Sequence, residues 1–348
     1  MNSHIYREGH RYFILSSFIE YFLSSKTRQV IPLAFPEYKF SQPPQLDISI
    51  IIVSFNTREI LMRCLESIQK QTKGISYEVI VVDNASEDRT AETVSKKFKN
   101  IKVIANKENR GFSAANNQGI LISKGKKIAF LNPDTSLTEN SFEKILKYME
   151  KHPKFSILGS GIVDKNNKPC PVRLWEDTPQ SAALKIFNIY EPSSELKRMG
   201  KMEAKEVQVI SGCCFVVVRK LIETVGLMDE NYFLYNEEDD FCRRARIKGM
   251  KICFYPETSV RHLHGKSTHQ EAYREKVILE TYKSNLYFYS KYYSRPWNLI
   301  LRILYKLTFV VGLIRSIIKY LAGRATADDS IQLKLRLLLM TSKTNRPF

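Results

Sequence analysis

Short apolar runs and amphipathic stretches alternate along the chain from residue 47 onward. Four β-branched runs with polar flanks predict strands that are buried on both faces of a sheet. They are ISIIIVSF (48–55), YEVIVVD (77–83), IKVIAN (101–106) and KKIAFLN (126–132). Between these runs apolar residues recur at helical spacing, as at Leu61, Leu65 and Ile68. The alternation predicts parallel strands that are joined by right-handed crossovers.

The alternation loosens after about residue 155. Further strands are predicted in FSILGSGIVD (155–164) and VQVISGCCFVVV (207–218), with a helix from about Asn236 to Gly249. We therefore expect a mixed, mainly parallel α/β sheet flanked by helices. The expected organisation is an N-terminal extension (1–46), one domain (47–270) with nucleotide-binding (47–150) and second-substrate (151–270) halves, and a helical C-terminal region (271–348).

The C-terminal region is strongly apolar from Leu299 to Ala322, but charged residues interrupt it. Its longest uncharged run, Leu307 to Ile314, is much shorter than the ~20 residues that a membrane-spanning helix needs. We therefore expect this region to lie on a bilayer and not to cross it. The alternative is a pair of helices packed against the protein core.

The cations of this region do not fit one straight amphipathic helix. At ~100° per residue, Arg302 and Lys306 share one face, whereas Arg315 and Lys319 fall on roughly the opposite one. The pattern therefore predicts two short interfacial helices that are hinged near Gly312.

The net charge indicates the kind of partner. Lys and Arg number 54 and Asp and Glu 36, so the formal charge is +18, which favours nucleic acid, an anionic membrane or phosphorylated substrates. Nucleic acid is disfavoured because acids cluster at residues 237–240, where a groove would be basic, and no nucleic-acid module is recognised. From Arg295 onward ten basic residues face only Asp328 and Asp329, which favours an anionic membrane surface.

The six cysteines and the N-terminus bear on the compartment. The cysteines show no CxxC pairing, which argues against a zinc site and a disulfide framework and favours a reducing cytosol. The apolar run YFILSSFIEYFL (12–23) is interrupted by Glu20, and no small-residue cleavage site follows it. We expect an intracellular protein.

Polar segments follow the four predicted strands, at the sheet edge where α/β proteins bind ligands. They are SFN (54–56), DNASED (83–88), NKENRGFSAANNQG (106–119) and NPDTS (132–136). Neither GxGxxG nor GxxxxGK[ST] occurs, so the common dinucleotide and P-loop phosphate sites are absent. Each segment alone is also compatible with ordinary turn and cap chemistry; their shared edge favours a nucleotide site.

Seven motifs resemble one enzyme family in order and spacing. They are ISIIIVSFN, VIVVDNASED, NRGFSAANNQGI, AFLNPDTSL, SGCCFVVVRK, GLMDENYFLYNEEDDFCRRARIKG and VRHLHGKST. Together they resemble the family 2 inverting glycosyltransferases, most closely the rhamnosyltransferase-like branch of bacterial cell-surface polysaccharide synthesis. The resemblance covers residues 47–270 and implies the GT-A (nucleotide-diphospho-sugar transferase) fold, with 151–270 as the acceptor and catalytic half.

The resemblance assigns residues to the sugar nucleotide. Asp83 resembles the aspartate that accepts a hydrogen bond from the pyrimidine of UDP or dTDP. Ser54 and Asn56 are expected to line the base and ribose, and Arg110 and Asn117 to close over the nucleotide.

The resemblance also implies a divalent cation, Mg²⁺ or Mn²⁺, on the donor diphosphate. Asn132 and Asp134 stand where many GT-A enzymes have Asp-x-Asp. A carboxylate oxygen suits such a hard cation, so Asp134 is the expected ligand. His262 resembles the histidine that completes the metal or phosphate site in some relatives; the alternative is a structural histidine.

Four consecutive acids begin the helix predicted after Asn236. Asp239 and Asp240 have Arg243 and Arg244 four residues later, the spacing of helical ion pairs. The two glutamates before them have no such partner, so we expect them to be unpaired. The alternative is that the acids only complement the positive end of the helix dipole.

Inverting transfer needs a carboxylate that takes the proton of the attacking acceptor hydroxyl. The resemblance maps this general base to Glu238, with Asp240 ordering the helix and Glu237 as the next candidate. It implies transfer of a sugar such as rhamnose from a dTDP- or UDP-sugar to a saccharide or lipid-linked saccharide. The expected location is cytoplasmic, peripheral on the inner face of the cell membrane.

Two other functions were weighed. A sugar-1-phosphate nucleotidyltransferase needs a Gly-rich, basic signature after the first strand, and SFNTREI (54–60) lacks it. A non-catalytic, membrane-associated nucleotide-sugar-binding protein is the remaining alternative.

Overall fold

The computed structural model describes residues 37–186, 203–210, 212–263 and 274–321. The leader that was examined for a signal peptide and the basic residues beyond 321 lie outside the described residues. The chain divides into two compact units. One contains 33–176 and 192–288, and the other contains 177–191 and 289–348 together with the first 32 residues.

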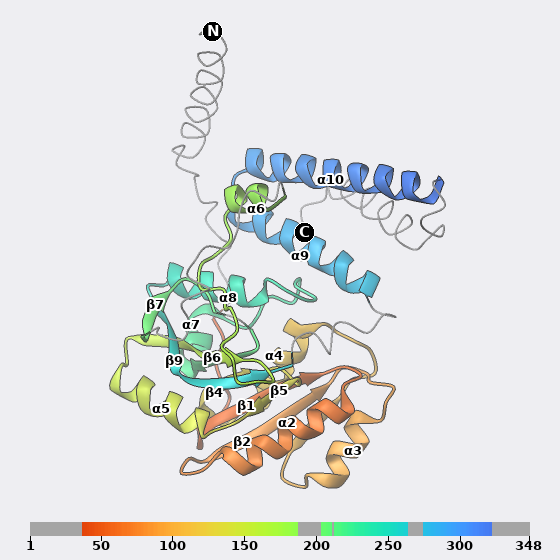
Figure 1. Ribbon diagram of the computed structural model, residues 1–348. Helices are drawn as coiled ribbons and strands as arrows, with labels where there is room; N and C mark the ends of the chain where they lie inside the picture. The colour runs from red at the N-terminus through yellow and green to blue at the C-terminus, as the bar shows by residue number, and fades with distance from the viewer. Residues whose placement is uncertain (1–36, 187–202, 211, 264–273, 322–348) are drawn as a thin grey trace. The chain divides into compact units, whose positions relative to one another are not determined.

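The larger unit is built on one mixed sheet (Figure 1). Its hydrogen-bonded order is β3-β2-β1-β4-β8-β6-β9-β5, and β7 pairs with β9. The strands are β1 (Leu46–Ser54), β2 (Tyr77–Asp83), β3 (Lys102–Ala105), β4 (Gly125–Leu131), β5 (Thr135–Leu137), β6 (Phe155–Val163), β7 (Lys205–Val207), β8 (Cys214–Val218) and β9 (Lys251–His262). The predicted mixed α/β sheet is confirmed.

The first four strands pair in parallel, as their apolar runs predict. β1 and β2 are buried over almost their whole length, so their β-branched residues pack on both faces. The described helices of this half are α2 (Arg58–Gln71), α3 (Thr90–Lys97), α4 (Phe112–Ile122) and α5 (Ser141–Lys151). This arrangement brings the carboxyl ends of β1, β2 and β4 to one edge of the sheet.

The second half inserts antiparallel strands. β8 runs antiparallel to both β4 and β6, while β6 and β9 are parallel. The single strand predicted over 207–218 is wrong, because β7 and β8 are separate strands with different neighbours. Between them the amides of Gln208 and Val209 both donate to the carbonyl of Leu174, so these residues pair with a loop and not with the sheet. The apolar pattern of residues 207–218 does not by itself distinguish a strand from a loop of this kind.

Helices α7 (Arg219–Val225) and α8 (Glu237–Ile247) lie between β8 and β9 in the chain. The remaining helices are α6 (Pro179–Ile186), α9 (Arg274–Tyr292) and α10 (Arg295–Leu321). α8 confirms the helix predicted between Asn236 and Gly249, and Gly249 follows it with a φ of 75°.

The prediction of two helices hinged near Gly312 is wrong, because α10 is continuous across it. One internal glycine costs a helix about 1 kcal/mol, which the surrounding good helix formers offset. The cations also fit one helix. Arg302 and Lys306 lie on one border of its exposed apolar face and Arg315 on the other, rather than on opposite sides of a hinge.

Length and composition also bear on the expected bilayer position. Over Arg295–Arg315, α10 is long and apolar enough to cross a membrane. The expectation that this region is too short to cross a bilayer was therefore too strict, because it considered only the longest run without a charged residue.

Candidate active site

Asp83 lies at the end of β2, in register with Ser54 at the end of β1. Its side chain is buried, and the hydroxyl and amide of Ser86 donate to its two oxygens at 2.5 and 3.2 Å. Burial raises the pKa of Asp83 above its usual value, against the lowering effect of these hydrogen bonds. The edge thus holds a fixed carboxylate whose acceptor oxygens have set directions.

Ser54 and Asn56 lie at the end of β1, beside Asp83 at the end of β2. The Ser54 hydroxyl hydrogen bonds that of Thr57 at 2.9 Å. The amide of Asn56 donates to the Ser86 hydroxyl at 2.8 Å, and its side-chain oxygen accepts from the amide of Glu87 at 2.7 Å. The structure therefore brings Ser54, Asn56 and Asp83 together, as expected for one ligand, and also uses them to order the turn.

Asn84 connects this edge to the segment that carries Arg110. Its side-chain nitrogen donates to the carbonyl of Gly111 at 3.0 Å, and its oxygen accepts from the amide of Arg110 at 3.3 Å. Asn84 itself is 2% exposed. Sequence reasoning did not single it out, because an asparagine after a strand is common in turns.

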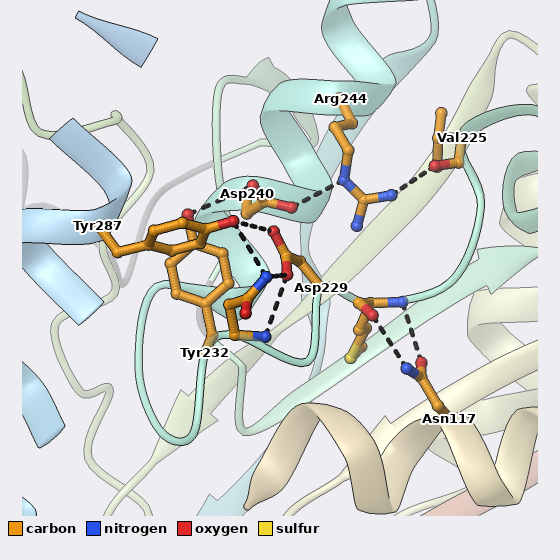
Figure 2. Close-up of polar contacts among 9 residues, drawn as sticks. Asn117, Val225, Asp229, Tyr232, Asp240, Arg244 and Tyr287 are labelled. Carbon is orange, nitrogen blue, oxygen red and sulfur yellow. Dashed lines mark hydrogen bonds and ion pairs between the residues drawn. The ribbon is translucent and has the colours of Figure 1, made fainter. Parts of the chain in front are cut away.

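Asn117 hydrogen bonds the segment before α8, unlike Ser54 and Asn56, which lie beside Asp83 (Figure 2). From α4, its amide oxygen accepts from the Met228 amide and its nitrogen donates to the Met228 carbonyl, both at 2.9 Å, and to Glu230 at 3.0 Å. These bonds tie α4 to the segment before α8. Asn117 therefore holds α4 to residues 228–230.

The NPD turn follows β4 directly. The amide of Asn132 donates to the carbonyl of Cys213 at 2.9 Å, beside β8. Asp134 is 1% exposed, and its Oδ1 lies 3.0 Å from Nε2 of His262, which sits opposite Thr135 in the β5–β9 pairing. The structure brings together Asp134 and His262, the two residues that the resemblance assigns to one site.

The second carboxylate oxygen of Asp134 bears on a metal. Oδ2 is buried and has no hydrogen-bond partner among the described residues. An acceptor oxygen in this state fits a hard cation, which carboxylate oxygens bind well. Among the described residues, no group of three or more metal-binding side chains gathers at one point.

Helix α8 begins after two non-glycine residues in the left-handed region, Tyr235 and Asn236, with φ of 67° and 64°. Within the helix, Asp240 pairs with Arg244 at 2.7 Å, which confirms one predicted ion pair. The Tyr232 hydroxyl also donates to Asp240 at 3.4 Å, and Arg244 continues to the Val225 carbonyl (Figure 2). Asp240 thus joins the helix to the segment before it.

The second predicted pair, Asp239 with Arg243, is wrong. Asp239 instead binds Arg173 at 2.6 Å, and Glu176 binds both Arg243 and Arg246. Helical spacing reveals only partners on the same helix, whereas these come from a segment more than sixty residues earlier in the chain. Arg173 and Glu176 were missed for that reason.

Glu237 and Glu238 were both expected to be unpaired, and Glu238 differs from that expectation. Oε1 of Glu238 lies 3.9 Å from the Arg173 guanidinium, at the limit of an ion pair. Each glutamate also has a buried Oε2 without a hydrogen-bond partner among the described residues. Burial raises the pKa of both carboxyls; the charge of Glu238 raises that of Glu237 further, and Asp239 that of Glu238.

Glu238 and the NPD turn flank the same short segment. A Cβ placed on Gly212 would lie 3.4 Å from the Glu238 carboxyl, so this side chain faces the glycine. The next residue, Cys213, accepts the hydrogen bond from Asn132. The acid at the start of α8 and the turn that carries Asp134 therefore both lie next to residues 212–213.

The profile of one family matches this chain. Its description is "Glycosyl transferase family 2", and it covers residues 49–226, just over half of the 348 residues. The match includes the Asp83 edge and the NPD turn, and it ends before α8 begins.

Curated proteins are also similar. A low-salt glycan biosynthesis hexosyltransferase, Agl10, of Haloferax volcanii is 26% identical over 59% of this chain, and the match spans 64% of that protein. An N-acetylglucosaminyl-diphospho-decaprenol L-rhamnosyltransferase of Mycobacterium tuberculosis is 24% identical over 73% of this chain and 88% of its own length. The crystal structure of GalNAc-T7 with UDP, GalNAc and Mn²⁺ aligns with a TM-score of 0.49 and 20% identity over 70% of this chain and 50% of that one.

Replacing the most deeply buried of the two glutamates tests the electrostatics of the site. Since the folded state holds the Glu237 proton above the ordinary pKa of 4.5, stability falls as pH rises from 4.5 through the raised folded pKa. Glu237→Gln cannot ionise and escapes this loss. Its Tm should exceed that of the unmodified protein at pH 8 and approach it near pH 4.5, as measured by differential scanning fluorimetry.

Glu206→Gln is the matched control, because Glu206 is about half exposed. It should leave the pH dependence of Tm unchanged. A Glu237→Gln protein that melts lower at pH 8 than the unmodified one would show that the buried charge is stabilising, contrary to this reading.

Proposed function

This chain belongs to glycosyl transferase family 2, and on that premise we propose an inverting sugar transfer in which Glu238 is the general base. A glycosyltransferase role in glycan synthesis follows from the family, and the mixed α/β sheet is the expected GT-A fold. The observation that carries the base assignment is the position of Glu238 across Gly212–Cys213 from the NPD turn.

The chemistry assigned to Glu238 is one proton transfer. Its carboxylate takes the proton of the acceptor hydroxyl as that oxygen attacks the anomeric carbon of the donor, on the side away from the diphosphate. The new glycosidic bond forms while the bond from that carbon to the diphosphate oxygen breaks. The bonding pair leaves with the nucleoside diphosphate, and Glu238 ends the step protonated.

The donor site is assigned to the edge formed by β1, β2 and β4. Asp83 would accept a hydrogen bond from a pyrimidine base, as in dTDP- or UDP-sugars, with Ser54 and Asn56 beside the base and ribose. Asn132 would face the diphosphate, and Arg110 would approach it from the segment held by Asn84. The fixed orientation of Asp83 by Ser86 supports this role, because a base is recognised by acceptors with set directions.

One relative supports a proposal for the sugar and the acceptor. The M. tuberculosis protein is named for L-rhamnose transfer to a lipid-linked acceptor, N-acetylglucosaminyl-diphospho-decaprenol. We assign to this chain the same class of reaction: transfer of a deoxyhexose such as rhamnose to a lipid-linked saccharide. A lipid-linked acceptor is compatible with an exposed apolar helix in the same chain.

Asp134 and His262 are assigned to a divalent cation, Mg²⁺ or Mn²⁺. The orphaned Oδ2 of Asp134 supports this, and the His262 contact holds the other oxygen in place. Such an ion, when bound, would offset the negative charge that develops on the leaving diphosphate. Asn132 is a weaker ligand than a second aspartate, so the diphosphate would supply more of the coordination.

The surface of α10 supports peripheral attachment to the inner face of a cell membrane. Its exposed apolar side chains occupy about a third of the helix circumference at ~100° per residue. They are Leu299, Ile303, Leu307, Val310, Val311, Ile314, Ile317 and Ile318. Arg302 and Lys306 on one border and Arg315 on the other would reach anionic headgroups, as in helices that lie in the interface plane.

Glu238→Gln removes the base and keeps the size of the side chain. Transfer should fall by at least about a hundredfold, since general base catalysis contributes ~10²–10⁴. Nucleotide affinity, measured by calorimetry, should stay within about twofold. Glu206→Gln on the surface is the control and should keep full activity. Turnover that survives in Glu238→Gln would move the base elsewhere, first to Glu237.

Asp134→Asn tests the assigned metal ligand. In the unmodified protein, binding of UDP or dTDP should be tighter with Mn²⁺ than with EDTA, because an ion held by Asp134 would offset the charge of the diphosphate. The substitution should abolish that difference while leaving metal-free affinity nearly the same. Equal affinity with and without Mn²⁺ in the unmodified protein contradicts the assignment.

Leu307→Glu with Ile314→Glu tests the apolar face of α10 in the full chain. Burying one such side chain is worth ~1.5–3 kcal/mol, so sedimentation with vesicles of anionic phospholipid should weaken at least about tenfold. Gln69→Glu with Ser95→Glu adds the same charge at exposed positions of α2 and α3 and should sediment like the unmodified protein. Equal binding by both double variants rules out this face as the anchor.

A further inference from the structure

One short segment supplies the charged partners that α8 lacks within itself. Residues 172–176 run alongside 208–209, where the Leu174 carbonyl accepts from the amides of Gln208 and Val209 at 3.0 and 3.2 Å. The amide of Glu176 donates to the Gln208 side chain at 3.3 Å. Leu174 is buried, and its neighbours on either side are less so. The segment is thus fixed to the domain before it meets α8.

Its charges match those of α8 in order. The cation, Arg173, meets the acidic start of the helix at Asp239, 2.6 Å away. The anion, Glu176, meets the basic part at Arg243 and Arg246. Shifting the segment along the helix would place like charges together, so the two contacts fix its register. The result is a guanidinium that is held 3.9 Å from Oε1 of Glu238.

We propose that Arg173 is a positioning residue of the transfer reaction: anchored by Asp239, it keeps the partly buried Glu238 ionised so that it can accept the acceptor's proton. The inference rests on the proposed role of Glu238 as the base. Arg173 does not touch the reacting atoms in this account. It acts through the charge state and orientation of its neighbour.

The groups that face Glu238 favour this role. On α8 these are Glu237 and Asp239, both acids; from 172–176 it is Arg173; from the loop before β8 it is Gly212, with no side chain. Burial and Asp239 raise the pKa of Glu238, and Arg173 lowers it. Arg173 is therefore the cation, among the described residues facing Glu238, that opposes its protonation. A protonated Glu238 has no capacity to take a second proton.

The test is the pH dependence of kcat in the full-length protein. An opposite charge at this range shifts a carboxyl pKa by ~1–3 units, so Arg173→Gln should move the acid limb of the profile up by about that amount. One unit below the shifted limb, kcat should be about tenfold lower than at its plateau, with donor KM within about twofold of the unmodified value. Arg173→Lys keeps the charge and should largely restore the original limb.

Two controls separate this role from a structural one. Glu176→Gln loosens the other end of the segment but keeps the cation, so it should lower Tm without moving the acid limb. Lys147→Gln removes a cation that pairs with Glu143 on the surface of α5 and should change neither.

The outcomes are distinct. If Arg173→Gln lowers kcat equally at every pH, or if Arg173→Lys shifts the limb as far as Arg173→Gln does, the inference is overturned. In that case inactivity of Glu238→Gln leaves the proposed base standing. Retained turnover in Glu238→Gln overturns the base assignment and the inference together.

Discussion

The acids that begin α8 are removed from water, and the rest of the site depends on how their charge is accommodated. Asp239 and Asp240 are 2% and 0% exposed, and Glu237 is 5% exposed. Burying an ion costs several kcal/mol, whereas the helix dipole returns about 0.3–1 kcal/mol, or up to ~2 in partly buried geometry. The dipole alone cannot hold these carboxylates. Ion pairs with Arg244 inside the helix and Arg173 outside it are required.

That requirement explains why a strongly basic chain concentrates acid at one place. The two aspartates form ion pairs with arginines, and these pairs fix the first turn of the helix. The two glutamates each keep a buried oxygen without a hydrogen bond among the described residues, and burial raises the pKa of both carboxyls. The proposed proton transfer needs both features: a first helical turn that is held in place, and a carboxyl oxygen that has no hydrogen-bond partner among the described residues.

The segment before α8 is hydrogen bonded to several other elements. These bonds connect the start of α8 to α4 and α9. Asn117 on α4 binds Met228, and the Phe112 amide donates to the Phe233 carbonyl at 2.7 Å. From α9, the Tyr287 hydroxyl donates to Asp229 at 2.9 Å (Figure 2). Gly111 has no room for a Cβ, which would lie 2.8 Å from the Phe233 carbonyl oxygen. The segments around Gly111 and Phe233 are thus packed backbone to backbone, and a displacement of one should displace the other.

Local patterns predicted the parts that depend on local physics. The β-branched runs gave β1 to β4, and the acids after Asn236 with Gly249 gave both ends of α8. The resemblance placed Asp134 with His262, and the structure joins them. Contacts such as Arg173 with Asp239 were not predictable, because the local sequence of either segment gives no signal for a partner 66 residues away. Asn117 was assigned to the nucleotide for the same reason, since its bonds to Met228 are invisible in the sequence. The hinge at Gly312 failed because one glycine is a weak helix breaker.

The most direct test of this account is a crystal structure of the full chain with Mn²⁺ and a nucleoside diphosphate sugar. The account predicts a base beside Asp83, a diphosphate beside Asp134, and the Glu238 carboxylate facing the anomeric carbon from the side opposite the diphosphate. Arg173 should remain bound to Asp239, next to the carboxylate and not between it and the sugar. A donor bound away from the β1, β2 and β4 edge, or a Glu238 screened from the sugar by the Arg173 guanidinium, contradicts it.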